Sequence, residues 1–574
     1  MQVKLLCLLL VVPLVVACVS VQESRSSAAS HQPVKPLVAK QAVVEKVATP
    51  LNAELLYNIL AGELAGRRGD MSLASVFYAN AAETSQDPDL ALRAVQIAIY
   101  NKDAVRATSM VNILLENGQA GAQIHQLALT VYLASGEVAK SLKQAGALLA
   151  ISKIPLRNTL LSLGDIITRS SNKQVAYGVM EGLIKKYPDE SATYLARSQI
   201  ALRFNDKTQA KQYAKKALDI GPNWSVAYVQ LARVHESEGD IAAALRVMKD
   251  ANARFADNRI AMKYAQLLAH NKQYKDAEQL FSSILAKDEK HHEARFSMAL
   301  VVLKQGKAAE AKELFTMLHD AGAFSSKSAF YLGRISFGVG ELKPAISWFE
   351  KVAQGPVYID AQANVAMIKS TLGDLAGARA IAAKLRAIYP AKATRFYVLE
   401  GEFLADAEQY VELFELMTEA VKKSPDDLTL RYTRSIAAAE LNKIDIVEDD
   451  LQTVLKREPN NVNALNALGY TLASKTFRFD EARGYLTKAL SFRPDDSAIL
   501  DSMGWLNYRS GRYEEALVLL EKAYSKQPEA EIALHLGETL WVLGRQREAK
   551  DLWQKAIQSF PKDKRLAEVL EKTQ

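Results

Sequence analysis

The strongest constraint on the fold of this chain is a short pattern that returns every 33 to 35 residues. A small residue, usually alanine, is followed four positions later by a larger residue and seven positions later by another small one. A fixed period of this length indicates a repeat protein, in which each unit buries its apolar faces only by stacking on its neighbours. The leading positions are Ala74, Ala107, Ser141, Ala176, Ala210, Ala244, Ala277, Ala311, Ala345, Ala378, Leu413, Val447, Ala482, Ala516 and Ala549.

Each unit has the composition of two helices joined by a turn. In the clearest unit, Gly504 lies in the first helix, where a small residue lets two helix axes approach, and Gly511 lies in the turn, where glycine tolerates a positive φ. Proline cannot donate the next backbone hydrogen bond, so recurrent prolines are expected to follow second helices. They are Pro188, Pro222, Pro390, Pro425, Pro459, Pro494, Pro528 and Pro561.

This unit resembles the tetratricopeptide repeat, whose 34 residues carry small or aromatic side chains at fixed places and often a proline at the end. The resemblance covers residues 53–566 and implies an all-α fold, a right-handed superhelical solenoid of about fifteen helix pairs. We expect residues 567–574 to form a C-terminal tail. The units near Leu413 and Val447 lack the small leading residue, and those around Ser141 and Ala176 match weakly, so we expect local changes in curvature there.

The N-terminus has the pattern of a signal peptide. Lys4 supplies a positive charge, residues 5–16 are apolar, and Ala17 directly precedes Cys18. This ending resembles the lipobox of bacterial lipoproteins, which implies that residues 1–17 are removed and that Cys18 carries the lipid. An uncleaved anchor, or an ordinary signal peptide cut elsewhere, is the alternative.

The residues after Cys18 imply an address and a tether. No aspartate comes immediately after Cys18, which resembles the outer-membrane sorting signal of Gram-negative lipoproteins. Residues 18–52 are rich in Ser, Ala, Val, Pro and Lys without helical periodicity, which predicts a flexible tether. We therefore expect an outer-membrane lipid anchor with the body on the periplasmic face.

The long helical body carries no recognisable catalytic signature. The sequence lacks a Gly-rich phosphate loop, an H-E-x-x-H motif and a G-x-S-x-G elbow, so we expect no enzyme activity and no cofactor. Acidic and basic residues alternate, and the formal charge of +7 is spread over 574 residues, so we expect no nucleic-acid binding. Both cysteines lie in the first 18 residues, which excludes a cysteine-built zinc site in the body.

One histidine pair has a metal-like composition. His291, His292 and Glu293 are adjacent at the expected start of a first helix. Neighbouring residues point about 100° apart on a helix, so they are poorly placed to share a metal. We interpret them as a solvated helix start and predict no metal site.

The first helices should form the inner, ligand-facing surface of such a solenoid. Aligning the repeats places nine side chains at positions that resemble the family's ligand-facing ones, and aromatic and arginine side chains are the usual anchors of protein interfaces. The alternative is that the aromatic rings belong to the core between repeats. The nine are Phe296, Phe330, Arg334, Phe337, Tyr470, Trp505, Tyr508, Arg509 and Trp541.

A closer resemblance rests on the first unit. Residues 61–70 read AGELAGRRGD and residues 87–94 read DPDLALRA. Together with the lipobox and the strong C-terminal units, they resemble the long tetratricopeptide lipoproteins of Gram-negative bacteria. Some of these bind a periplasmic carboxyl-terminal processing protease, a serine protease, and present cell-wall cross-link hydrolases to it. The resemblance therefore implies a protease adaptor with peptidoglycan hydrolase clients. A scaffold for exopolysaccharide export or for another envelope assembly complex is the alternative.

Overall fold

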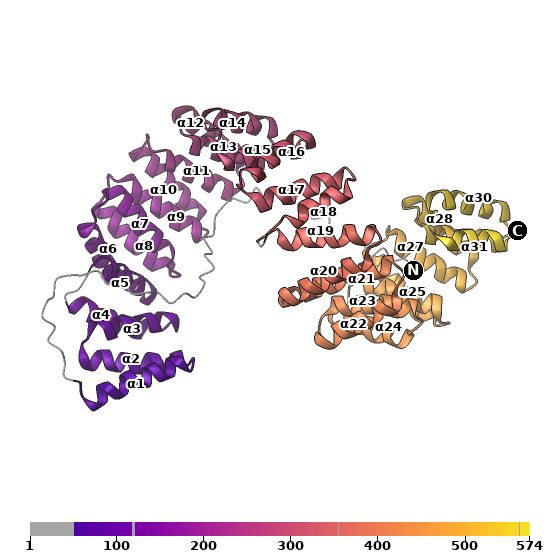
Figure 1. The fold of residues 1–574 in the computed structure, drawn as a ribbon, viewed down its shortest axis with the longest axis horizontal. Helices are drawn as coiled ribbons and strands as arrows, with labels where there is room; N and C mark the ends of the chain where they lie inside the picture. The colour runs from indigo at the N-terminus through magenta and orange to yellow at the C-terminus, as the bar shows by residue number, and fades with distance from the viewer. Residues whose placement is uncertain (1–50, 118–120, 354, 562, 574) are drawn as a thin grey trace. The chain divides into compact units, whose positions relative to one another are not determined.

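The computed structural model describes residues 51–117, 121–353, 355–561 and 563–573, which form 31 α-helices, one short 3-10 helix and no strand (Figure 1). The described chain divides after Lys307 into two compact units. The predicted signal peptide, Cys18 and all but the last two residues of the predicted tether lie outside the described residues. Within the described ranges, no helix is both long enough and apolar enough to cross a bilayer.

The N-terminal unit, residues 51–307, consists of helices most of which pack on the next helix in the chain. It contains α1 Ala53–Arg67, α2 Met71–Ser85, α3 Pro88–Tyr100, α4 Ala104–Glu116, α5 Ala122–Ser135, α6 Val138–Ile151, α7 Leu156–Thr168, α8 Lys173–Lys186, α9 Ser191–Arg203, α10 Lys207–Ile220, α11 Ser225–Glu238, α12 Ile241–Arg254, α13 Asn258–His270, α14 Tyr274–Lys287 and α15 His292–Lys304.

The C-terminal unit, residues 308–573, continues the alternation of first and second helices. It contains α16 Ala308–Asp320, α17 Ser325–Gly338, α18 Leu342–Glu350, α19 Tyr358–Thr371, α20 Leu375–Ile388, η1 Pro390–Lys392, α21 Ala393–Asp406, α22 Tyr410–Lys423, α23 Leu428–Glu440, α24 Ile444–Arg457, α25 Val462–Lys475, α26 Phe479–Phe492, α27 Ser497–Arg509, α28 Tyr513–Lys526, α29 Ala530–Val542, α30 Gln546–Ser559 and α31 Lys564–Lys572.

The predicted repeat register is confirmed at every unit. All fifteen leading residues, from Ala74 to Ala549, are the fourth residue of an even-numbered helix, and none is more than 2% exposed. At Leu413, where the leading residue is large, the facing α21 provides Gly401, and a Cβ built there would lie 3.0 Å from Leu413 Cδ1. A glycine in the first helix therefore makes room for the larger residue in the second.

The predicted turns and helix ends are also confirmed. Gly511 and Gly544 have φ of +78° and +81°, a conformation that glycine adopts without strain. All eight recurrent prolines lie two residues beyond the end of a second helix, as Pro528 does after Lys526. The repeats are thus delimited by the backbone chemistry of two residue types.

The packing order changes around α7, in the part of the chain where the repeat pattern is weak. Gly164 of α7 lies against Ala196 of α9, and α7 packs mainly on α9 rather than on α8. Gly178 and Gly182 of α8 face Val138 and Leu142 of α6. Glycines at these contacts allow helices that are not neighbours in sequence to pack closely.

The predicted tail boundary at residue 566 falls inside a helix. Most of the segment 567–574 belongs to α31, whose Leu566 is buried and whose Val569 and Leu570 pack on the core cluster around Trp553. An amphipathic final helix covers the apolar side of α30, as a terminal cap of a solenoid must. This helix lacks the repeat pattern, which is why the periodicity did not reveal it.

Two carboxylates of the C-terminal unit are buried between arginines. Asp450 of α24 accepts two hydrogen bonds of 2.7 Å from Arg434 and one of 2.9 Å from Arg431, both on α23. Glu400 of α21 is held in the same way by Arg379 and Arg386 of α20. A buried charge is tolerated only when it is paired, so these groups tie neighbouring helices together.

Candidate functional site

The candidate site lies on the first helices of the last three repeats, α25, α27 and α29. In each helix a buried glycine, Gly469, Gly504 or Gly537, faces the second helix of its own repeat, so close that a Cβ would overlap with a side chain there. Residues one to six positions away from these glycines lie on the side of each helix that faces the neighbouring first helices. We call the surface formed by these residues the first-helix face. It consists of Tyr470, Asp501, Trp505, Tyr508, Glu531, His535 and Glu538.

Aromatic rings form a continuous layer on the first-helix face. The indole of Trp505 stacks on the His535 ring at 4.0 Å between centroids and on the Tyr508 ring at 4.8 Å, with interplanar angles of 17° and 11°. Tyr470 reaches His535 with its ring centroid 6.2 Å away. Stacking of this kind orders large flat side chains before any partner arrives.

A hydrogen bond on the first-helix face links two repeats that are separated by a third. The Tyr470 hydroxyl of α25 donates to Glu531 Oε1 of α29 at 2.7 Å. Burial, together with the Glu531 carboxylate, raises the pKa of Tyr470 well above its usual value, so the phenol keeps its proton. The side chains of α25 and α29 therefore meet over α27.

The His535 ring of the aromatic layer forms a buried acid–base pair with Asp501 of α27. His535 Nδ1 is 2.9 Å from Asp501 Oδ1 and 3.1 Å from Oδ2, and both residues are less than 10% exposed. Burial alone would lower the pKa of His535, but Asp501, together with the charges of Glu531 and Glu538, outweighs burial and raises that pKa above its ordinary value. The pair fixes the orientation of the imidazole against Trp505.

Carboxylates also border the aromatic layer. Glu538 is half-buried, and burial raises its pKa. Away from this layer, on α21, Glu402 and Asp406 lie one turn apart, and burial together with Asp406 raises the pKa of Glu402 to about 7. Flat rings beside carboxylates can hold apolar side chains and the cationic side chains of lysine or arginine.

The structure brings three of the nine predicted residues together on the first-helix face. The other six lie outside that face. Tyr470, Trp505 and Tyr508 are the three on the face. Arg509 donates from Nη1 to the Ser474 carbonyl oxygen of α25, so its guanidinium joins two helices. Trp541 stacks on the buried Trp553 at 6.1 Å and belongs partly to the core, the alternative foreseen for aromatic residues.

The remaining four predicted residues lie on α15 and α17. Phe330 contacts Tyr331 and Phe349 at 5.7 and 5.8 Å between ring centroids and packs on a core cluster. Arg334 is half-buried, and Phe337 is exposed. Phe296 is half-buried on α15, which belongs to the N-terminal unit.

Asp501, Glu531 and His535 were not predicted from the sequence. His535 and Asp501 lie 34 residues apart in different repeats, so the pair is not visible within any single unit. A search for opposite charges at a separation of one repeat length would have found the pair.

The adjacent histidines His291 and His292 lie at the start of α15. His291 caps this helix by accepting a hydrogen bond from the Ala294 N–H at 3.2 Å, as expected for a helix start.

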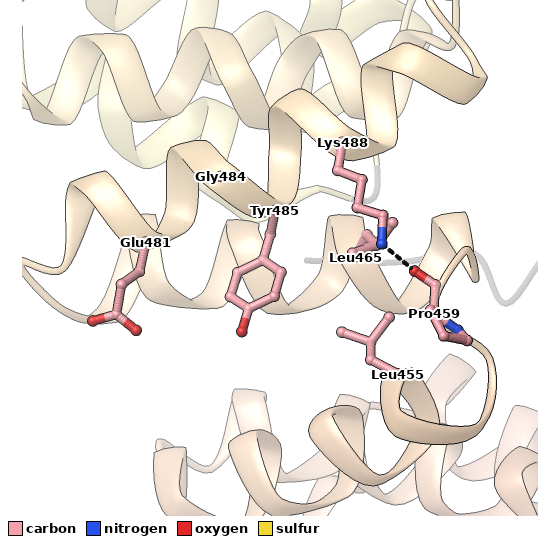
Figure 2. Close-up of a pocket in the computed structure, with 7 residues that line it drawn as sticks. All are labelled: Leu455, Pro459, Leu465, Glu481, Gly484, Tyr485 and Lys488. Carbon is pink, nitrogen blue, oxygen red and sulfur yellow. Dashed lines mark hydrogen bonds between the residues drawn. The ribbon is translucent and has the colours of Figure 1, made fainter.

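A separate pocket of about 380 Å³ lies between α24, α25 and α26 (Figure 2). Its walls are mainly apolar, and across its rim Lys488 Nζ donates to the Pro459 carbonyl oxygen at 2.7 Å. Its lining includes none of the nine predicted residues. The lining residues are Leu455, Pro459, Leu465, Glu481, Gly484, Tyr485 and Lys488.

Family models described as tetratricopeptide repeat match several parts of the chain. The matched residues are 191–223, 229–292, 268–326, 432–497 and 502–564. The last two ranges contain nearly the whole first-helix face, all but Asp501. Phe330, Arg334 and Phe337 lie outside the matched residues.

A curated relative and two solved structures are similar to parts of the chain. The TPR repeat-containing protein PA4667 of Pseudomonas aeruginosa is 39% identical over 209 residues, which is 36% of this chain and only 35% of the relative. PilF of Pseudomonas aeruginosa is 23% identical, with a TM-score of 0.31 over 38% of this chain and 97% of that one. A thermophilic TPR protein of Thermus thermophilus is 21% identical, with a TM-score of 0.30 over 32% of this chain and 98% of that one.

Two findings thus agree on the architecture. The described residues are all-helical, with a 33- to 35-residue register, and the family models match in that same register. Residues 191–223, 229–326, 432–497 and 502–564 are tetratricopeptide repeats, and the described helices of each unit have the solenoid fold of the tetratricopeptide type.

Proposed function

We propose that this protein is an outer-membrane-anchored periplasmic scaffold that binds a carboxyl-terminal processing protease and presents cell-wall hydrolases to it for degradation. The observation that carries the scaffold part is the ordered aromatic layer of Trp505, Tyr508 and His535, bordered by carboxylates, on three consecutive first helices. Pre-ordered aromatic side chains favour the binding of a protein segment, because little rotamer entropy is lost on association.

The first-helix face also suggests the chemistry of the bound segment. Half-buried Glu538 places a carboxylate beside the rings, whereas Asp501 and Glu531 are engaged by His535 and Tyr470. A segment with lysine or arginine beside an apolar residue would pair with Glu538 and stack on the rings. We propose that such a segment of the protease or of its client is held here.

Affinity purification of the protein from gently solubilised envelopes, followed by mass spectrometry, tests this function. We expect stoichiometric recovery of a processing protease, with a cell-wall hydrolase enriched when the protease is inactivated. Recovery of polysaccharide synthase or export subunits without a protease would contradict the adaptor and favour the export scaffold.

The variant Glu538→Lys tests the face itself. It reverses one charge beside the aromatic layer and should weaken protease or client capture about tenfold, as loss of an interfacial charge pair does. Helical content should not change. Glu568→Lys, on the exposed side of α31, is the matched control and should bind as the unmodified chain does. Equal capture by both variants would remove this face from the proposal.

The anchor is tested by Cys18→Ala. The variant should lose palmitate labelling completely, because Cys18 is the residue that carries the lipid in this proposal. Cys7→Ala is the control, since Cys7 lies in the segment that would be removed, and it should stay membrane-bound. A Cys18→Ala protein that still labels with palmitate would contradict the proposed anchor.

A further inference from the structure

The imidazole of His535 lies on the first-helix face at the point where side chains of three repeats meet. Its ring stacks on Trp505 of α27 at 4.0 Å between centroids, and the ring of Tyr470 of α25 is 6.2 Å away. Its Nδ1 atom is 2.9 Å from Oδ1 of Asp501, also on α27, and both side chains of this pair are buried. One titratable ring therefore links α29 to α27 and α25.

Carboxylates surround this imidazole. Asp501 of α27 contacts it directly, and Glu531 and Glu538 of α29 also favour its charged form. From α25, Tyr470 presents a phenol that keeps its proton and donates a hydrogen bond of 2.7 Å to Glu531. While the imidazole is charged, it offsets part of the negative charge that the three carboxylates place in one cluster.

The other elements that pack on α29 bring apolar side chains and one arginine. Leu520 of α28 and Trp553 of α30 belong to the apolar cluster that packs against α29. Arg565 of α31 pairs with Asp563 at 2.7 Å and favours the charged form of Glu531. The charge of the imidazole therefore depends chiefly on the carboxylates of the first-helix face.

Loss of the His535 proton removes the positive charge that Asp501 pairs with. Asp501, Glu531 and Glu538 raise the pKa of His535 above its ordinary value of 6.5, although burial alone would lower it. The unfolded chain has the ordinary value, so the stabilisation is fully present below about pH 6.5 and is lost as the pH rises through the folded-state pKa. Above that pH the Asp501 carboxylate stays buried without a charged partner, which costs free energy.

We propose that His535 is a proton-operated switch of the first-helix face: its charged ring holds α25, α27 and α29 together, and deprotonation loosens the aromatic layer. This loosening is a property of the chain alone and needs no partner. Capture of a segment by the stacked rings would weaken together with the layer, a consequence that rests on the proposed function.

Hydrogen–deuterium exchange of the full chain in detergent, followed by mass spectrometry between about pH 6 and about pH 9, tests this switch. After correction for the intrinsic pH dependence of exchange, protection of α27 and α29 should fall by up to about tenfold per pH unit above about pH 6.5. It should level off above the folded-state pKa. Peptides of α24 in the same unit are the internal reference and should show no such fall. Constant protection of α27 and α29 across this range in the unmodified chain would overturn the proposal.

Substitutions identify the titrating group. His535→Gln retains a hydrogen-bond donor for Asp501 but does not titrate, so α27 and α29 should exchange faster and without this pH dependence. Asp501→Asn removes the carboxylate that favours the charged ring, so the fall in protection should move to lower pH. His319→Gln, on α16 of the same unit, is the matched control and should keep the unmodified profile.

The outcomes separate the switch from the proposed function. If His535→Gln or Asp501→Asn keeps the pH profile of the unmodified chain, another group titrates and the proposal is overturned. If the fall in protection follows His535 as expected while partner capture stays the same across the pH range, the switch stands and the first-helix face is not the capture site.

Discussion

Replacing Asp450 by alanine is expected to cost the C-terminal unit about 3–5 kcal/mol of unfolding free energy. Asp450 is fully buried and accepts hydrogen bonds from Arg431 and Arg434, so its removal leaves two guanidinium groups partly buried without their shared partner. The loss should be visible as faster amide hydrogen exchange in α23 and α24, which reports local stability even where a repeat protein does not unfold in one step.

The neighbouring residue provides a matched control. Asp449 also contacts Arg431, at 3.4 Å, but its side chain is 68% exposed. Exposed ion pairs contribute little, so Asp449→Ala should change stability by less than about 1 kcal/mol. If Asp449→Ala and Asp450→Ala accelerate exchange to the same extent, the buried arginine pair is not what holds α23 to α24.

Gly537→Ala is expected to destabilise the last repeat by about 3 kcal/mol, because a single methyl group there has no space. A Cβ at this position would overlap with Nε1 and Cε2 of Trp553, a rigid indole that is 1% exposed. Either the indole leaves the core or α29 moves away from α30, and overpacking of this kind typically costs about 1–3 kcal/mol or more. Thermal or urea unfolding followed by tryptophan fluorescence would measure the effect.

A glycine-to-alanine substitution at Gly484 should instead raise the free energy of unfolding. Gly484 lies in α26 beside the pocket of Figure 2, and a Cβ there would meet nothing within 4 Å. Gly484→Ala should therefore stabilise α26 by about 0.5–1 kcal/mol through backbone entropy alone. In the Gly537→Ala background, Trp553→Leu should recover part of the loss by vacating the space. A destabilised Trp553→Leu, Gly537→Ala double variant with no recovery would place the strain elsewhere.

The repeat register was predictable because it depends on local steric demands. A small residue such as Ala516 is needed at the fourth position of most second helices, and a proline such as Pro528 cannot continue the helix. Both residue types therefore recur at a fixed interval in the sequence. The packing of α7 on α9 and the closing helix α31 are not marked by any residue that recurs at this interval. Both depend on which apolar surfaces remain uncovered once the neighbours have packed.

The candidate site was only partly predictable for a related reason. Alignment of the repeats located Trp505 and Tyr508, since their positions recur in every first helix. It did not distinguish them from Phe330, whose ring packs beside Phe349 in the core. Asp501, Glu531 and His535 make their contacts with other repeats, and a motif search within one repeat does not reveal such contacts.

The hydrogen bond between Tyr470 and Glu531 has a mechanical consequence. In an ideal solenoid each repeat contacts only its neighbours, so all junctions between repeats should extend equally under tension. Because this bond and the contact between Tyr470 and His535 bypass a repeat, the three pairs from α25 to α30 should deform together as one stiff block. Under tension, elongation would be confined to the more compliant joints outside this block, so a segment held on α25, α27 and α29 would keep its geometry while the rest of the unit extends.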